Sequence, residues 1–108
     1  MTVQQLMETC GFTAAALPQP DREVSGVYIG DLLSWVMGRA GADEAWITIM
    51  SNRNVVAVAT LADTACIVLA EGVSPDEGVA ELAAQKGVNI LQSPESAYRI
   101  ALRLRDAL

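Results

Sequence analysis

Two short apolar segments, 45–50 (AWITIM) and 65–70 (ACIVLA), constrain the fold of this chain more than any other feature. Both are apolar, and the first is rich in residues that favour strands, so each is predicted to be a buried strand. About fifteen residues separate them, a length that suits a crossover helix between parallel strands. We therefore predict a helix over 54–62, although its β-branched residues would also suit a strand.

The same strand-to-helix step occurs on both sides of these segments. A strand over 24–29 is followed by a helix over 32–39, with Gly30 allowing the bend and Asp31 predicted as the N-cap. Later, Ser74 and Ser93 each precede a proline and resemble helix starts. The helix that begins at Ser74 should end at Gly87, and a short strand over 88–91 should precede the last helix.

The N-terminal part is less regular. Residues 2–10 are predicted to form a helix that Thr2 caps and Gly11 ends. Residues 12–17 are predicted to be a short strand, although their three alanines would equally suit a helix. Taken together, the alternating elements predict one α/β domain over residues 1–108, with three α/β/α layers and a mostly parallel sheet.

Composition excludes several classes of function. The chain has 108 residues, a formal net charge of −6 and no histidine. Nucleophile systems that depend on histidine and metal sites with histidine ligands are therefore absent. The phosphate loop GxxxxGK[ST] is also missing, and no basic patch suggests nucleic-acid binding. We predict a protein that is not an enzyme and needs no cofactor or metal.

The sequence also indicates a location. Its apolar runs are far shorter than the roughly 18 residues of a membrane span, and the N-terminus lacks the basic and apolar regions of a signal peptide. Cys10 and Cys66 do not form a disulfide framework, and Cys66 is predicted to be a buried thiol. We therefore expect a cytoplasmic protein that does not bind membranes.

The loops after successive parallel strands meet at one edge of such a sheet, where ligands of open α/β proteins bind. Helix starts and polar side chains at this edge can hold a small anionic ligand. The same groups also serve as ordinary helix caps, and both interpretations remain open. The candidate ligand-binding residues are Asp31, Ser51, Asn52, Arg53 and Asn54.

Two predicted helices, 32–39 and 54–62, lack a clean polar face. Each must be covered on two sides, either by a broad core or by another subunit. We predict a homodimer, because apolar surface left uncovered usually marks an interface and twofold dimers are the commonest assembly. Leu32 and Trp35 are predicted to lie at its centre, because aromatic side chains dominate such patches.

Several blocks of the sequence resemble one known family, in the same order. They are DREVSGVY over 21–28, GDLLS over 30–34, WITI over 46–49, NVVAVA over 54–59 and GVNIL over 87–91. Together they resemble the DRTGG domain. Asp21 and Arg22 match the start of that motif and Gly26 matches one of its glycines, whereas Thr-Gly-Gly does not occur as a contiguous run.

DRTGG domains are similar to the N-terminal domain of HPr kinase/phosphorylase, and they also occur in phosphotransacetylases and between the CBS domains of regulatory pyrophosphatases. The resemblance implies a fold like that N-terminal domain and a regulatory or dimerising module. It does not imply kinase chemistry, because the kinase's phosphate loop lies in a separate domain. Free-standing copies sometimes occur beside hydrogenase-type genes, which implies a metabolic or hydrogenase-type enzyme as a partner.

The sequence therefore predicts a non-catalytic regulatory and dimerising module that senses a small anionic metabolite or a nucleotide. Three alternatives stay open. The first is a structural adaptor that docks onto an enzyme partner. The second is a serine-kinase-like protein without a catalytic domain of its own, and the third is a small enzyme that uses carboxylates.

Overall fold

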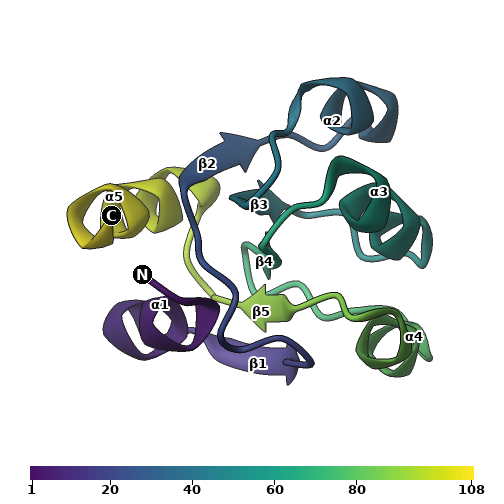
Figure 1. The fold of residues 1–108 in the computed structure, drawn as a ribbon, viewed down its shortest axis with the longest axis horizontal. Coiled ribbons are helices and arrows are strands. Elements are labelled where there is room, and N and C mark those ends of the chain that lie inside the picture. The colour runs from purple at the N-terminus through teal and green to yellow at the C-terminus, as the bar shows by residue number, and fades with distance from the viewer.

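The computed structural model describes all residues 1–108 and contains one five-stranded sheet in the order β1-β5-β4-β3-β2 (Figure 1). Strands β2 to β5 are parallel, and β1 pairs antiparallel with β5. The strands are β1 (Thr13–Ala16), β2 (Gly26–Ile29), β3 (Glu44–Thr48), β4 (Cys66–Leu69) and β5 (Ile90–Gln92). The helices are α1 (Val3–Cys10), α2 (Leu33–Arg39), α3 (Asn54–Ala62), α4 (Val79–Lys86) and α5 (Ala97–Ala107).

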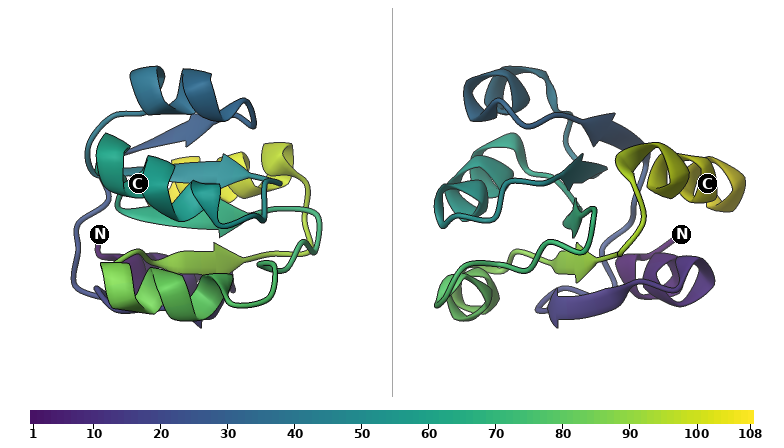
Figure 2. Two further views of the ribbon diagram at one scale, coloured as in Figure 1. Left: turned by 90° about the vertical axis from the view of Figure 1, so that its right-hand side faces the viewer. Right: turned by 180° about the vertical axis from the view of Figure 1, so that it is seen from behind.

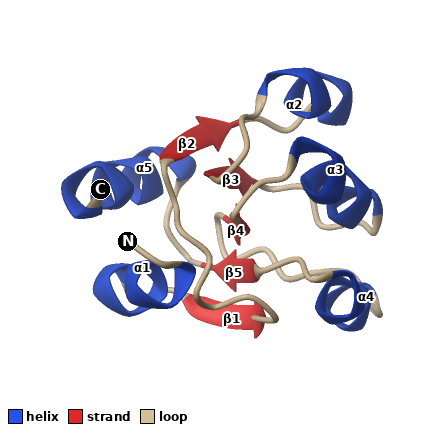
Figure 3. Ribbon diagram, viewed as in Figure 1, coloured by secondary structure: helices blue, strands red, loops and turns tan.

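Helices cover both faces of the sheet (Figure 3). Helices α2, α3 and α4 lie side by side on one face, and α1 and α5 lie on the other, as the two further views also show (Figure 2). Right-handed crossovers that step across a sheet in one direction place their helices on the same face. The predicted three-layer α/β/α fold with a mostly parallel sheet is confirmed, including the helix over 54–62.

The sheet divides the core into two apolar clusters. Ala45, Ile47 and Val68 pack toward α1 and α5, whereas Trp46 and Ile67 pack toward the other three helices. Each of these side chains is fully buried. Because central parallel strands are covered on both faces, their sequences are apolar without alternation. This explains why the two segments with the strongest apolar character are β3 and β4.

The start of α4 differs from the prediction. The helix begins at Val79 rather than just after Ser74, and Gly78 before it has a φ of +83°. The loop that precedes α4 is hydrogen-bonded to the loop that follows β3. The Asp76 amide donates to the Ser51 carbonyl at 3.0 Å, and the Ser51 hydroxyl donates to Asp76 Oδ1 at 2.7 Å. Asp76 is therefore bound to a distant segment instead of continuing a helix.

The start of α5 is also later than predicted. Ser96, not Ser93, is the N-cap, and its hydroxyl accepts a hydrogen bond from the Arg99 amide at 3.3 Å. The Ser93 hydroxyl instead accepts from the Glu95 amide at 3.1 Å and shapes the loop. At the other end of the chain, Thr2 caps α1 in a capping box with Gln5, and Gly11 ends the helix as predicted.

Candidate functional site

The predicted ligand-binding residues lie at one end of the sheet, which we call the carboxyl edge. Asp31 follows β2, residues 51–53 follow β3, and Asn54 opens α3. The strand order along the parallel part is sequential, so this edge has no point where the order reverses. Open α/β proteins usually bind ligands at such a reversal, and this edge lacks that crevice.

Asp31 does not cap α2, and this prediction was wrong. Leu32 occupies the N-cap position, and no side chain caps the helix. Asp31 Oδ1 instead accepts hydrogen bonds from the Thr48 hydroxyl at 2.7 Å and the Ile49 amide at 2.9 Å. Thr48 is buried, and its hydroxyl also accepts from the Met50 amide. Asp31 therefore joins the end of β2 to the end of β3.

Replacing Asp31 by alanine should lower the free energy of unfolding by about 1.5 kcal/mol, because two hydrogen bonds to a carboxylate are lost and the Thr48 hydroxyl loses its acceptor. Urea denaturation measures this change. Ser34→Ala is the matched control, since Ser34 is exposed on α2, and it should change stability by less than about 0.5 kcal/mol. Equal effects of the two substitutions would contradict the role given to Asp31.

The next three candidates, Ser51, Asn52 and Arg53, differ in their hydrogen bonds and ion pairs. Ser51 binds Asp76, and Asn52 Oδ1 accepts from the Asn54 amide at 2.9 Å at the start of α3. Arg53 is exposed and forms no ion pair, and it borders a small cavity of about 110 Å³ together with Glu77. Arg53 is thus the one cationic side chain of the set that is available to an anion. No cluster of three or more acidic or thiol side chains is placed to hold a metal.

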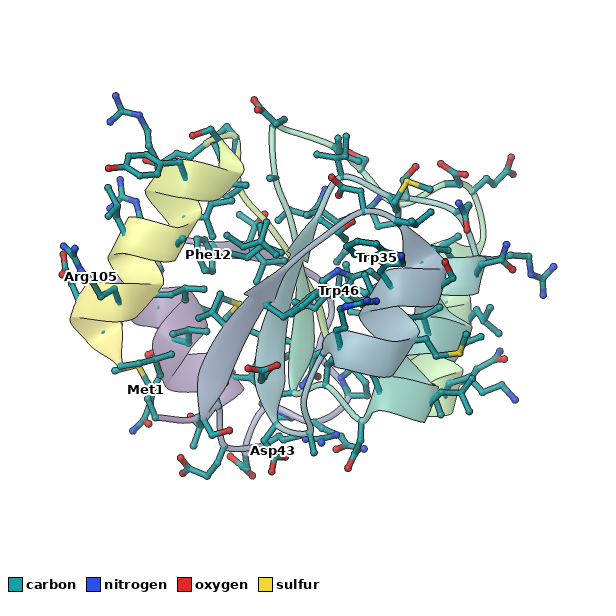
Figure 4. All side chains as sticks on the ribbon, turned by 90° about the horizontal axis from the view of Figure 1, so that it is seen from above. Met1, Phe12, Trp35, Asp43, Trp46 and Arg105 are labelled. Carbon is teal, nitrogen blue, oxygen red and sulfur yellow. The ribbon has the colours of Figure 1, made fainter.

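The motif residue Arg22 lies at the opposite end of the strands, the amino edge. Its guanidinium donates to Asp43 Oδ1 at 3.0 Å, to Asp63 Oδ1 at 2.8 Å and to the Asp63 carbonyl at 2.6 Å. Burial is the largest single influence on the pKa of Arg22, and it lowers this pKa. The hydrogen bonds and charges of Asp63 and Asp43 together outweigh it, so the pKa of Arg22 lies above its usual value. We call Arg22, Asp43 and Asp63 the Arg22 cluster, and Figure 4 shows Asp43 at this edge.

The Arg22 cluster fixes three loops at once. Asp43 immediately precedes β3, Asp63 ends α3 just before β4, and both have positive φ values, of 66° and 60°. The Asp43 amide also donates to the Asp63 carbonyl at 2.9 Å. Neither partner of Arg22 was predicted from the sequence. The available signal was that each aspartate lies two residues before a predicted buried strand, which places both at the same edge of a parallel sheet.

The other two motif residues differ in their surroundings. Asp21 is exposed in the turn before Arg22. Gly26 leaves room for Glu44 of β3, because a Cβ at position 26 would lie 3.1 Å from Glu44 Oε2. Glu44 in turn accepts a hydrogen bond from the Gly41 amide, so its carboxylate closes the loop between α2 and β3. Arg22 and Gly26 therefore have structural roles at the amino edge.

An apolar surface surrounds the carboxyl end of β2. Four side chains there are about half exposed or more: Ile29 at 50%, Leu32 at 60%, Trp35 at 55% and Ile49 at 48%. We call these four residues the β2 surface. Strand β2 pairs only with β3, so its outer edge carries backbone groups without strand partners. Figure 4 looks onto this edge, which lies uncovered between α5 and α2.

The side chain of Trp35 has a defined position on this surface. The Arg39 guanidinium lies 4.0 Å from the centre of its ring, on the same helix. Trp46, by contrast, is fully buried behind α2, where its Nε1 donates to the Gly30 carbonyl at 2.8 Å. The two tryptophans lie on the α2 side of the sheet in Figure 4. Trp46 is part of the core, and Trp35 remains at the surface.

Comparison with known families bears on this arrangement. The DRTGG domain model matches residues 18–107, which include the Arg22 cluster, β2 to β5 and α2 to α5. The chain belongs to the DRTGG domain family. The resemblance found in the sequence is thereby confirmed over most of the chain. Helix α1 and strand β1 precede the matched residues.

A solved structure extends the comparison to the whole DRTGG fold. It is the CBS and DRTGG domains of the regulatory region of Clostridium perfringens pyrophosphatase, complexed with its activator, diadenosine tetraphosphate. The TM-score is 0.72 at 10% sequence identity, and the match covers 99% of this chain and 47% of that one. At this identity the likeness shows the fold alone. The search of curated proteins found no match.

One further finding concerns membranes. None of the five helices combines the length and the apolar character needed to cross a bilayer.

Proposed function

We propose that this DRTGG domain is a non-catalytic regulatory module that self-associates through the β2 surface. The observation that carries the proposal is the open edge of β2 beside the four exposed apolar side chains of the β2 surface. Soluble proteins rarely leave an apolar edge strand uncovered, because it invites pairing with other chains. A twofold dimer would cover Leu32 and Trp35 of both copies, the two residues that the sequence predicts at the centre of the interface.

The state of the polar side chains supports a role without catalysis. Asp43 and Asp63 bind Arg22, Glu95 binds Arg103, and Asp31 holds the end of β3. Both cysteines are buried, and burial raises the pKa of the Cys66 thiol to about 12, so this thiol is not a thiolate at neutral pH. Two hydroxyls donate to carboxylates, Thr48 to Asp31 and Ser51 to Asp76, and both pairs connect loops. The chain has no histidine to act as the base of a nucleophilic triad.

Hydrogen–deuterium exchange at two protein concentrations tests the proposed interface. If β2 is covered on association, the amides of β2 and of residues 30–35 should exchange more slowly at high micromolar than at low micromolar concentration. Of the three helices on that face of the sheet, α4 is the one farthest from β2 (Figure 1). Its amides serve as the internal control, since their exchange should not depend on concentration. Concentration-dependent protection confined to α4 or α5 would refute the proposed interface.

A second role, sensing of a small anion or nucleotide at the carboxyl edge, is supported by Arg53 at the start of α3. An exposed, unpaired arginine next to a helix N-terminus suits phosphate. The nucleotide in the regulatory region of the C. perfringens pyrophosphatase suggests which anions to try. Asp76 and Glu77 lie in the loop that reaches this edge, and their negative charges oppose such binding.

ATP and diadenosine tetraphosphate at millimolar concentration should therefore raise the melting temperature by about 5 °C if the site binds them. Arg53→Glu should abolish this shift. Arg99→Glu is the matched control, because it changes the net charge by the same amount. Arg99 is exposed on α5, on the other face of the sheet. No shift with the wild-type protein, or the same shift in both variants, would reject the site.

A further inference from the structure

A second apolar surface lies on the outer side of the three-helix face, between α3 and α4. It is an open groove of about 480 Å³, and none of the residues of the β2 surface borders it. The residues that form its floor and ends are Val56, Ala57, Leu61, Leu82, Arg53 and Lys86. We call this the α3–α4 groove.

The groove exists because α3 has no polar face. One side of the helix packs into the core through Val55, Val58 and Ala59, and α2 lies beside it. The side toward α4 keeps Ala57 and Leu61 at the surface, and Leu61 is 70% exposed, the most exposed of the large aliphatic side chains. This exposure costs free energy in the isolated domain and would be relieved by an apolar occupant.

Charge distinguishes this groove from the rest of the surface. The chain has a net charge of −6 and seven cationic side chains. Arg22, Arg103 and Arg105 form ion pairs and Arg39 lies over Trp35. Of the three remaining cations, Arg53 and Lys86 both border the α3–α4 groove, and no carboxylate lines it. Glu77 and Asp63 border the small cavities that adjoin the groove at Arg53 and at Lys86, whereas the charged side chains of the groove itself are both positive. The groove lining is therefore complementary to negative charge, although the protein as a whole is acidic.

The two cations lie at opposite ends of the groove. Arg53 directly precedes α3 at the carboxyl edge, whereas Lys86 is the last residue of α4, at the amino edge. Helix α3 has nine residues, so it is about 13 Å long. An occupant that satisfies both cations needs negative groups about this far apart, with apolar surface between them.

We propose that the α3–α4 groove binds an amphipathic helix of a partner protein, with an apolar stripe that has a carboxylate near each end. A groove that is open along its side can bury only one face of its occupant. That suits a helix with an apolar stripe, whereas small-molecule sites usually enclose most of the ligand. This partner site is separate from the proposed dimer interface and does not depend on it.

Two designed peptides of about fifteen residues test the proposal. They share one leucine stripe, and glutamates flank the stripe in one peptide where lysines flank it in the other. Titrated into the ¹⁵N-labelled wild-type protein, the glutamate peptide should shift amide signals of α3 and α4, and the lysine peptide should bind at least about tenfold more weakly. Failure of the glutamate peptide to bind at millimolar concentration, shifts that map elsewhere, or equal binding of the two peptides would overturn it.

Charge reversal provides the matched comparison. The Arg53→Glu/Lys86→Glu variant should lose about tenfold in affinity for the glutamate peptide and gain affinity for the lysine peptide. Arg99→Glu/Arg105→Glu changes the net charge equally but lies on α5, and it should bind like the wild type. If both variants lose affinity alike, the attraction is general and the groove does not recognise the peptide.

A second copy of the chain is the rival occupant, and Leu61→Asp distinguishes it. The substitution should abolish peptide binding because it replaces an apolar side chain of the floor with a carboxylate, and it should leave the oligomeric state unchanged. A lower oligomeric mass for Leu61→Asp than for the wild type would show that copies of this chain fill the groove, which would reject the proposal.

Discussion

Arg22→Met is expected to lower the free energy of unfolding by about 3 kcal/mol, the largest stability effect of any surface substitution we consider. The guanidinium side chain is 20% exposed and donates to two carboxylates and one backbone carbonyl. Methionine keeps the length of the side chain but removes all of these hydrogen bonds. Asp43 and Asp63 are each more than half exposed, so water hydrates them in the variant and the cost stays below that of a buried ion pair.

Urea denaturation with linear extrapolation measures this loss of unfolding free energy, and two further variants show what causes it. Arg22→Lys keeps the charge but not the forked geometry and should cost roughly half as much. Arg99→Met removes an exposed arginine that forms no ion pair and should cost less than about 0.5 kcal/mol. If Arg22→Met is as mild as Arg99→Met, the Arg22 cluster does not hold the amino edge together.

Trp35→Asp should weaken self-association about a hundredfold, which is about 2.7 kcal/mol. Trp35 is the largest exposed apolar side chain of the β2 surface, and the substitution puts a charge where the two copies would meet. It also removes the contact with Arg39, which is worth about 0.5–1 kcal/mol at an exposed site. The fold should persist, because the Trp35 side chain is not part of either core cluster.

Light scattering after size-exclusion chromatography reports this change, and far-ultraviolet circular dichroism verifies that the variant is folded. Leu61→Asp is the control, since it introduces the same charge at a more exposed apolar position outside the β2 surface. A folded Trp35→Asp variant that elutes with the wild-type mass would place the interface elsewhere.

The sequence predicted the fold because its strongest signals come from the centre of the sheet. Strands β3 and β4 are covered on both faces, so their sequences are unambiguous. The helix over 54–62 was predicted from the spacing of these strands against its own β-branched composition, since a parallel pair needs a crossover. Local propensity alone would have favoured a strand.

The starts of α4 and α5 were predicted less well, because they depend on contacts that are not local. Ser74 has the residue pattern of a helix cap, but Asp76 is bound to Ser51, 25 residues earlier. Near α5, the predicted cap Ser93 is followed three residues later by a second serine, Ser96, and the structure shows that Ser96 is the N-cap.

In the candidate site, too, contacts between residues that are distant in the sequence could not be predicted. The sequence placed Asp31 and residues 51–54 at one edge, and the structure brings them there. It did not reveal that Asp31 binds Thr48 or that Ser51 binds Asp76, because both partners come from other strands or loops. Arg22 was recognised as a motif residue, but its partners lie 21 and 41 residues away, so its role at the amino edge required the fold.

Self-association is the central claim, and sedimentation equilibrium of the wild-type protein tests it most directly. The chain has a mass of 11.4 kDa. We predict a reversible equilibrium at micromolar concentration in which the average mass rises with concentration toward twice that value and does not exceed it. A single species with the mass of one chain at every concentration, up to the millimolar range, would contradict the account.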